Sequence, residues 1–151
     1  MNRQTLEKRM EFFRARCAER GLALTHQRRV IYRILAETAQ HPTPEETFQQ
    51  VRREIPSISL ATIYKNIKVF LDSGLLIEIG TPGQTMRLDA SLDAHHHLIC
   101  SNCRMIFDIP AETVGPLQLA KPLPKYFRME SYTVNFAGHC AQCAPQVQSS
   151  I

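Results

Sequence analysis

Two Cys-x-x-Cys pairs constrain the fold of this chain more than any other feature. Cys100 and Cys103 form the first pair, Cys140 and Cys143 form the second, and 36 residues separate them. Each pair supplies two thiolates at one knuckle, and two knuckles complete a tetrahedral zinc site. Because all four ligands come from the protein, no position remains for a catalytic water. The spacing therefore predicts a structural zinc ion whose binding free energy stabilises this half of the chain.

The same cysteines have two alternative uses, as separate thiol pairs or as a thioredoxin-like redox pair. A redox pair normally begins a helix after a strand, whereas these pairs adjoin segments with the patterns of strands. The N-terminus, with Arg3, Lys8 and Arg9, lacks the apolar segment of a signal peptide, so we expect a cytoplasmic protein with reduced thiols. Cys17 lies on an apolar helix stripe, and we expect it to be a buried structural thiol.

A second set of metal-binding side chains surrounds the first cysteine pair. His95 and His97 are two residues apart, which places them on one face of a strand and His96 on the other. Asp89 and Asp108 flank them. Imidazole and carboxylate ligands suit Fe(II), Mn(II), Zn or Ni, so this set predicts a metal site with a different preference from the thiolate site.

Charge is distributed unevenly along the chain. Residues 1–90 contain 14 Lys/Arg and 10 Asp/Glu, whereas residues 91–151 contain 4 of each. The stretch 3–33 is the most basic, with nine basic and three acidic side chains. This asymmetry favours a polyanionic partner for the N-terminal half, and a solvated basic helix face is the alternative.

The N-terminal half has the order of elements of a winged helix-turn-helix. Apolar periodicity and capping residues predict four helices and then a hairpin with its turn at 81–84. The expected helices span 4–20, 25–38, 43–55 and 59–74, and the expected strands span 75–79 and 85–88. In this motif the last helix enters the major groove and the wing contacts the DNA backbone. A plain helical bundle is the alternative.

The exposed face of the helix from residue 59 has side chains that suit DNA. Tyr64 can stack or contact a thymine methyl, and Lys65 and Lys68 can reach phosphates or guanine edges. Thr62 shares this face. The helix capped by Thr25 is basic at its N-terminus, where free N–H groups favour a phosphate.

The C-terminal half predicts a small sheet. The segments 97–100 and 105–109 read as a hairpin with the first cysteine pair at its turn, and 128–136 alternates as a third strand. Glycine and three prolines between them permit only a short helical piece around 114–121. The chain is therefore expected to be an α+β protein.

Five motifs in order resemble the ferric uptake regulator (Fur) family. They are Thr-His-Gln-Arg at 25–28, His-Pro-Thr at 41–43, Ser-Leu-Ala-Thr-Ile-Tyr-Lys-Asn at 59–66, His-His-His-Leu-Ile-Cys-Ser-Asn-Cys at 95–103 and Gly-His-Cys-Ala-Gln-Cys at 138–143. The family consists of homodimeric, metal-dependent transcription regulators with an N-terminal winged helix and a C-terminal α/β dimerisation domain. The resemblance implies a DNA-binding domain at 1–88, a hinge at 89–94 and a metal-binding dimerisation domain at 95–151.

The resemblance also implies functional residues. The structural zinc (Zn²⁺) site keeps its four cysteines, and a regulatory site for Fe²⁺ or Mn²⁺ lies between the domains. The regulatory ligands would be His41, Asp89, His95, His97 and Asp108. The candidate contacts to a double-stranded DNA operator are Thr25, Gln27, Arg28, Ser59, Thr62, Tyr64, Lys65, Asn66 and Lys68.

Within the family the chain is most similar to the peroxide-sensing (PerR-type) subgroup. Asp89 and Asp108 stand where iron-sensing members commonly have glutamate. The resemblance implies that, with Fe(II) bound, peroxide oxidises His41 or His95 and ends repression. An iron- or zinc-responsive uptake repressor is the alternative.

Other functional classes fit the sequence less well. No apolar run approaches the roughly 20 residues that span a membrane, so no membrane partner is expected. A zinc deaminase needs a His-x-Glu segment, which this chain lacks, and we expect no enzymatic activity and no small-molecule substrate beyond metal and peroxide. A zinc-ribbon interaction protein remains an alternative, but it leaves the basic helices and the wing unexplained.

Overall fold

The computed structural model describes residues 3–80, 85–130 and 132–144. The chain divides into two compact units, residues 1–92 and 93–151, and each is described by itself. Among the described residues, every α-helix lies in the first unit. None of these helices has the length and apolar character needed to cross a membrane.

The first unit contains the helices α1 (Arg3–Glu19), α2 (His26–Glu37), α3 (Pro44–Val51) and α4 (Leu60–Asp72). The last three begin directly after a capping residue. Thr25 and Ser59 cap α2 and α4 by accepting a backbone N–H with their hydroxyl oxygens. Thr43 and Glu46 form a capping box at α3. However, α3 ends four residues earlier than expected, because residues 53 and 54 form tighter i→i−3 hydrogen bonds.

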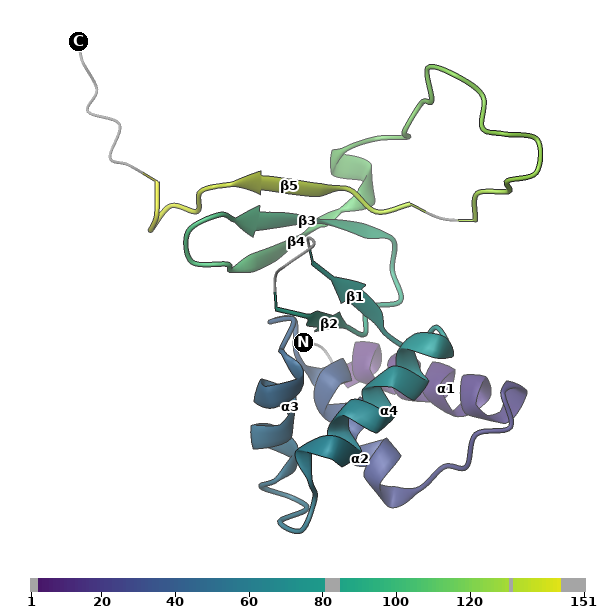
Figure 1. Ribbon diagram of the computed structural model, residues 1–151, viewed down its shortest axis with the longest axis vertical. Helices are drawn as coiled ribbons and strands as arrows, with labels where there is room; N and C mark the ends of the chain where they lie inside the picture. Colours follow the sequence, from purple (N-terminus) through teal and green to yellow (C-terminus); the bar gives the residue numbers. More distant parts are fainter. Residues whose placement is uncertain (1–2, 81–84, 131, 145–151) are drawn as a thin grey trace. The chain divides into compact units, whose positions relative to one another are not determined.

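An aromatic cluster joins three helices of this unit. The rings of Phe13 and Tyr32 stack with centroids 4.4 Å apart, and both meet Phe70 edge-on at 5.8 Å. These rings come from α1, α2 and α4. Cys17 is buried in the same core, as predicted, and burial raises the pKa of its thiol. The cluster packs α1 and α2 against the candidate recognition helix α4. Figure 1 shows the arrangement of these helices.

A two-stranded wing follows α4. Gly74, with a φ of +67°, ends that helix in the left-handed conformation that glycine adopts without strain. Strands β1 (Ile77–Ile79) and β2 (Arg87–Asp89) then pair antiparallel, with Ile77 opposite Asp89. The expected turn at 81–84 lies outside the described residues. The helices followed by this wing confirm the predicted winged helix-turn-helix.

The second unit is built on a three-stranded sheet. Strand β3 (His95–Cys100) lies between β4 (Ile106–Pro110) and β5 (Asn135–Gly138) (Figure 1). β4 is antiparallel to β3 and β5 is parallel to it. The hairpin of β3 and β4 confirms the predicted position of the first cysteine pair at a turn.

Two predictions for this unit are wrong in position. The helical piece expected at 114–121 is replaced by an earlier 3₁₀ turn, η1 (Ala111–Thr113), which is followed by Gly115 at a φ of +73° and then a proline. The third strand begins at Asn135 rather than at residue 128. The amide of Val134 donates to Nδ1 of His96, a side chain of β3, so regular backbone pairing starts only with the next residue.

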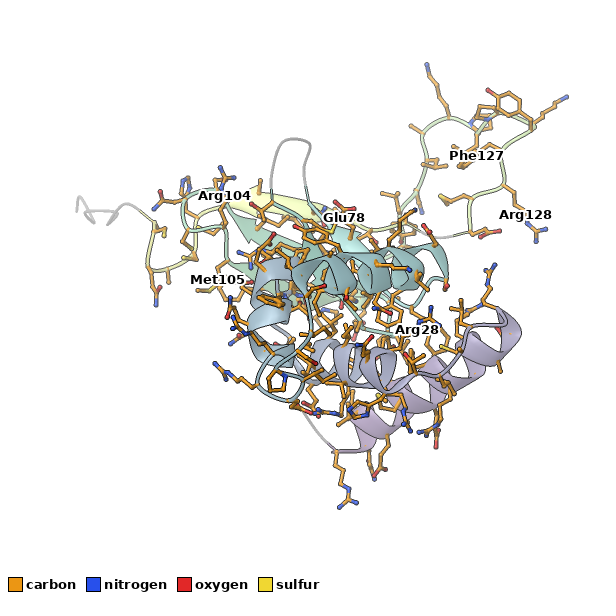
Figure 2. The ribbon with its side chains drawn as sticks, turned by 60° about the horizontal axis from the view of Figure 1, so that its bottom comes forward. Arg28, Glu78, Arg104, Met105, Phe127 and Arg128 are labelled. Carbon is orange, nitrogen blue, oxygen red and sulfur yellow. The ribbon has the colours of Figure 1, made fainter. Side chains whose placement is uncertain are left out.

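The segment 116–130 between η1 and β5 has no helix or strand. It extends away from the sheet and carries Phe127 and Arg128 near its far end (Figures 1 and 2). Tyr126 is 91% exposed. The prolines of this segment remove backbone donors, which explains why apolar residues here do not form a helix.

Candidate metal centres

The four paired cysteines gather at one end of the β3–β5 sheet. Cys100 ends β3, Cys103 follows in the turn, and the second pair lies in the turn after β5. Their sulfur atoms all lie within 4.8 Å of one another. The Sγ atoms of Cys103 and Cys140 are 3.7 Å apart. Zn–S bonds of about 2.3 Å in a tetrahedron place sulfurs about 3.8 Å apart, whereas a disulfide needs about 2.0 Å. The geometry therefore fits zinc.

Backbone amides prepare this site for a cation. The N–H of Cys140 donates to Sγ of Cys100 across 3.4 Å. This hydrogen bond, followed by one from the amide of Cys103, lowers the pKa of Cys100 to about 5. With a pKa of about 5, Cys100 is a thiolate at neutral pH, which is the form that binds zinc.

The ring nitrogens of His95 and His97 converge on one point in the second unit. Their Nε2 atoms are 3.0 Å apart. Nδ1 of His95 donates to the carbonyl oxygen of Asp93 at 2.8 Å, and Nδ1 of His97 donates to Oδ1 of Asn135 at 3.1 Å. In neutral rings both Nε2 atoms then present lone pairs to each other. A proton shared by the two nitrogens, or a metal ion bound to both, would stabilise this arrangement, and metal-ligating histidines are oriented by such bonds.

A carboxylate from β4 completes this group. Asp108 lies opposite His97 in the β3–β4 register. Its Oδ1 atom is 3.9 Å from Nε2 of both His95 and His97. Two imidazoles and one carboxylate form a nitrogen and oxygen donor set, which suits Fe(II), Mn(II) or Zn(II).

The first unit contains two further candidate ligands. Nδ1 of His41 lies 4.0 Å from Oδ1 of Asp89, which accepts a 2.7 Å hydrogen bond from the amide of Ser91. His41 has a φ of 47°, in the left-handed region, which costs about 1–3 kcal/mol and is typical of functional positions. The structure thus groups His41 with Asp89 in one unit, and His95, His97 and Asp108 in the other.

Comparison with known proteins decides the family of this chain. The sequence model of the ferric uptake regulator family matches residues 19–137. The chain belongs to the ferric uptake regulator family. The predicted resemblance is therefore confirmed, and with it the role of a metal-responsive regulator.

Individual Fur-family proteins are similar over nearly their full length. The peroxide-responsive repressor PerR of Staphylococcus aureus is 29% identical over 140 residues, which cover 93% of this chain and 95% of PerR. The solved structure of Helicobacter pylori Fur aligns with a TM-score of 0.71 at 19% identity, covering 92% of this chain and 93% of that one. The Campylobacter jejuni peroxide stress regulator aligns with a TM-score of 0.61 at 24% identity, covering 95% and 100%. The α+β fold is therefore that of Fur-family proteins.

The candidate DNA contacts of this Fur-family chain fall into two groups. Tyr64, Lys65 and Lys68 are exposed on α4. The hydroxyl of Tyr64 donates to a carboxylate oxygen of Glu45 on α3, which raises the pKa of Tyr64 and lowers that of Glu45. Lys68 forms an ion pair of 3.0 Å with Asp72.

The other candidate contacts have structural partners in the first unit. Asn66 is only 8% exposed, donates to the carbonyl of Thr62 and accepts from Nε of Arg28. Ser59 and Thr62 are hydrogen-bonded to each other at the helix start. Thr25 caps α2, where Gln27 is exposed. Their roles at DNA stay predictions, and the hydrogen bonds show how α2 and α4 are held together.

The sequence did not reveal the residues that orient the ligands. Asn135 orients His97, Asp93 orients His95, and Ser91 orients Asp89. Asp93 and Ser91 each lie two residues from the candidate ligand that they orient, so this short separation could have identified them from the sequence. Asn135 was not predictable, because its role depends on the parallel pairing of β5 with β3.

Proposed function

We propose that this chain is a metal-dependent transcriptional repressor that binds operator DNA as a homodimer and senses peroxide through oxidation of a ligand histidine. The convergence of the His95 and His97 lone pairs supports this proposal most directly. With Asp108, these two rings would form a nitrogen and oxygen site for an exchangeable ion. The neighbouring thiolate site suits a permanent Zn²⁺ ion.

The regulatory site would combine ligands from both units. His41 and Asp89 would share one Fe²⁺ or Mn²⁺ ion with His95, His97 and Asp108. Such sharing restrains residues 1–88 against residues 95–151, with 89–94 as the hinge. A domain pair restrained by metal reads DNA with a defined spacing, and loss of the metal removes that restraint.

Peroxide sensing is implied by the similarity of this set to that of PerR-type proteins, which have aspartate at the positions of Asp89 and Asp108. Fe(II), when bound, supplies the electron that activates peroxide next to the ligand rings. The rings of His41 and His95 are the expected targets. Each peroxide molecule would give one oxygen atom to one ring, and its other oxygen would leave as water. An oxidised imidazole is a poorer ligand, so the restraint and the affinity for DNA are lost together. The similarity of the whole chain to PerR supports peroxide sensing, and an uptake repressor of the same family is the alternative.

DNA binding is supported by the exposed face of α4 and the basic first half. Tyr64 and Lys65 would contact bases, and Lys68 would contact phosphate once it leaves Asp72. Residues 1–90 have a net charge of +4, from 14 basic and 10 acidic side chains, whereas residues 91–151 are neutral. This charge distribution favours a polyanion at the first unit.

Homodimer formation is supported by an apolar row across the small sheet. Phe107, Leu98 and Phe136 are cross-strand neighbours on one face of β4, β3 and β5. Their side chains are about 40% exposed (43%, 41% and 41%). A three-stranded sheet with an exposed apolar face gains stability when a second copy covers that face.

Peptide mass spectrometry tests the proposed function. Zinc-loaded protein is supplied with Fe(II) or Mn(II) and treated with peroxide. One part of the sample is digested for mass spectrometry. The intact remainder is tested by fluorescence anisotropy for binding to a DNA fragment selected from a random library. We expect one added oxygen on the peptides with His41 or His95 and loss of DNA binding, with Fe(II) only. Metal-dependent DNA binding without histidine oxidation would contradict peroxide sensing and favour the uptake repressor. DNA binding that is independent of metal would contradict both.

A further inference from the structure

The backbone around His41 is fixed by the wing strand β2. The amide of Leu88 donates to the carbonyl oxygen of Pro42 across 3.1 Å. Nη1 of Arg87 donates to the carbonyl oxygen of His41 itself across 3.3 Å. Two neighbouring residues of β2 therefore hold the loop that carries one candidate ligand, and the same strand ends in the other, Asp89.

Arg87 also contacts the start of α3. The same Nη1 atom lies 3.1 Å from Oε2 of Glu46. That carboxylate oxygen accepts the amide of Thr43 at 2.8 Å in the capping box. One guanidinium nitrogen thus connects the carbonyl of His41 with the carboxylate that caps α3.

The conformation of His41 explains why such a contact is needed. A φ of 47° is uncommon for a residue with a side chain and persists only where its surroundings enforce it. Arg87 helps to hold His41 in this conformation by donating to its carbonyl oxygen. It lies two residues before Asp89, on the same face of the strand. Arg87 therefore links the backbone of His41 to the strand that ends in Asp89.

We propose that Arg87 is a positioning residue for the regulatory metal. Arg87 holds His41 and Asp89 in the relative positions that bind the ion, and its contact with Glu46 connects these positions to α3. This inference rests on the proposed function, since it requires that His41 and Asp89 bind metal. A plain structural ion pair is the competing explanation, and the first unit offers one for comparison. Arg33 joins Glu37 and Glu54 at the surface with similar exposure, 33% against 26% for Arg87.

A Mn(II) titration of zinc-loaded protein separates the two explanations. Free Mn(II) is followed by electron paramagnetic resonance in the wild type, Arg87→Met, Arg87→Lys and the control Arg33→Met, and thermal unfolding is recorded for each. We expect Arg87→Met to weaken Mn(II) binding about 10–100-fold, as changes to groups that orient ligands do. Arg87→Lys should recover most of the affinity, because both contacts of Arg87 use one nitrogen atom that an ammonium group can replace. Arg33→Met should change unfolding but not Mn(II) affinity.

Two results would overturn the inference. One is an unchanged Mn(II) affinity in Arg87→Met, and the other is an equal loss of affinity in Arg87→Met and Arg33→Met. Either result leaves the proposed function intact. A wild-type protein that binds no Mn(II) besides its zinc contradicts the proposed function itself, so the two failures are distinguishable.

Discussion

Replacing Tyr32 by phenylalanine should stabilise the first unit. Tyr32 is 0% exposed and its ring packs between Phe13 and Phe70. Its hydroxyl has no hydrogen-bond partner among the described residues. A buried, unsatisfied hydroxyl costs about 1–3 kcal/mol, and Tyr32→Phe removes it while keeping the ring contacts. We therefore expect the free energy of unfolding at pH 7 to rise by about 1–3 kcal/mol.

The same substitution should change how stability depends on pH. Burial, as the largest cause, raises the pKa of Tyr32 from 10.0 to about 12. The unfolded chain releases this proton near pH 10, whereas the folded protein keeps it until about pH 12. The contribution of Tyr32 to stability is therefore complete below pH 10 and is lost as the pH rises to 12. A difference of about 2 pKa units corresponds to about 3 kcal/mol.

Urea unfolding at pH 7, 9, 10 and 11, followed by circular dichroism at 222 nm, measures both effects. All described α-helices lie in the first unit, so this signal reports on that unit. Tyr126→Phe is the control, because Tyr126 is 91% exposed. If Tyr32→Phe lowers stability at pH 7, or if the wild type and Tyr32→Phe lose stability equally above pH 10, the assignment of an unsatisfied buried hydroxyl is refuted.

Three further predictions concern the metal sites and DNA. Cys143→Ser should abolish zinc retention and unfold the second unit, measured by released zinc and hydrogen exchange of β3 peptides; retained zinc with native exchange would contradict the four-thiolate site. Glu45→Gln should tighten DNA binding a few-fold, because it keeps a partner for Tyr64 but removes a negative charge beside α4; anisotropy at two salt concentrations measures this, and weaker binding would oppose it. Asn135→Leu should weaken Mn(II) affinity about 10-fold or more by releasing Nδ1 of His97, and an unchanged affinity would show that this bond does not orient the ring.

Features specified by neighbouring residues were predictable from the sequence. The caps at Thr25, Thr43 and Ser59 require only side chains within three residues, and each helix begins where its cap predicts. The gathering of the cysteines followed from their spacing, because four thiolates in two pairs have one common use in a reduced protein.

Features specified by distant residues were not predictable in the same way. Alternation of apolar residues over 128–136 indicated a strand, but the pairing begins at Asn135 because His96 takes the amide of Val134. The contact of Arg87 with the carbonyl of His41 joins residues 46 positions apart. No local pattern records such a contact, since it depends on how the wing returns to the start of α3.

Strand β3 carries ligands of both candidate metal sites, and this sets an order of assembly. His97 and Cys100 are three residues apart, or about 10 Å along an extended strand. The register that aligns His97 with Asp108 and Asn135 ends at the cysteine knuckles. If zinc holds the cysteine knuckles together, we expect it to bind first, because the same strand register then presents the two histidines as a pair. Under the proposed function, scarcity of zinc would then weaken the response to the second metal whatever the supply of iron or manganese.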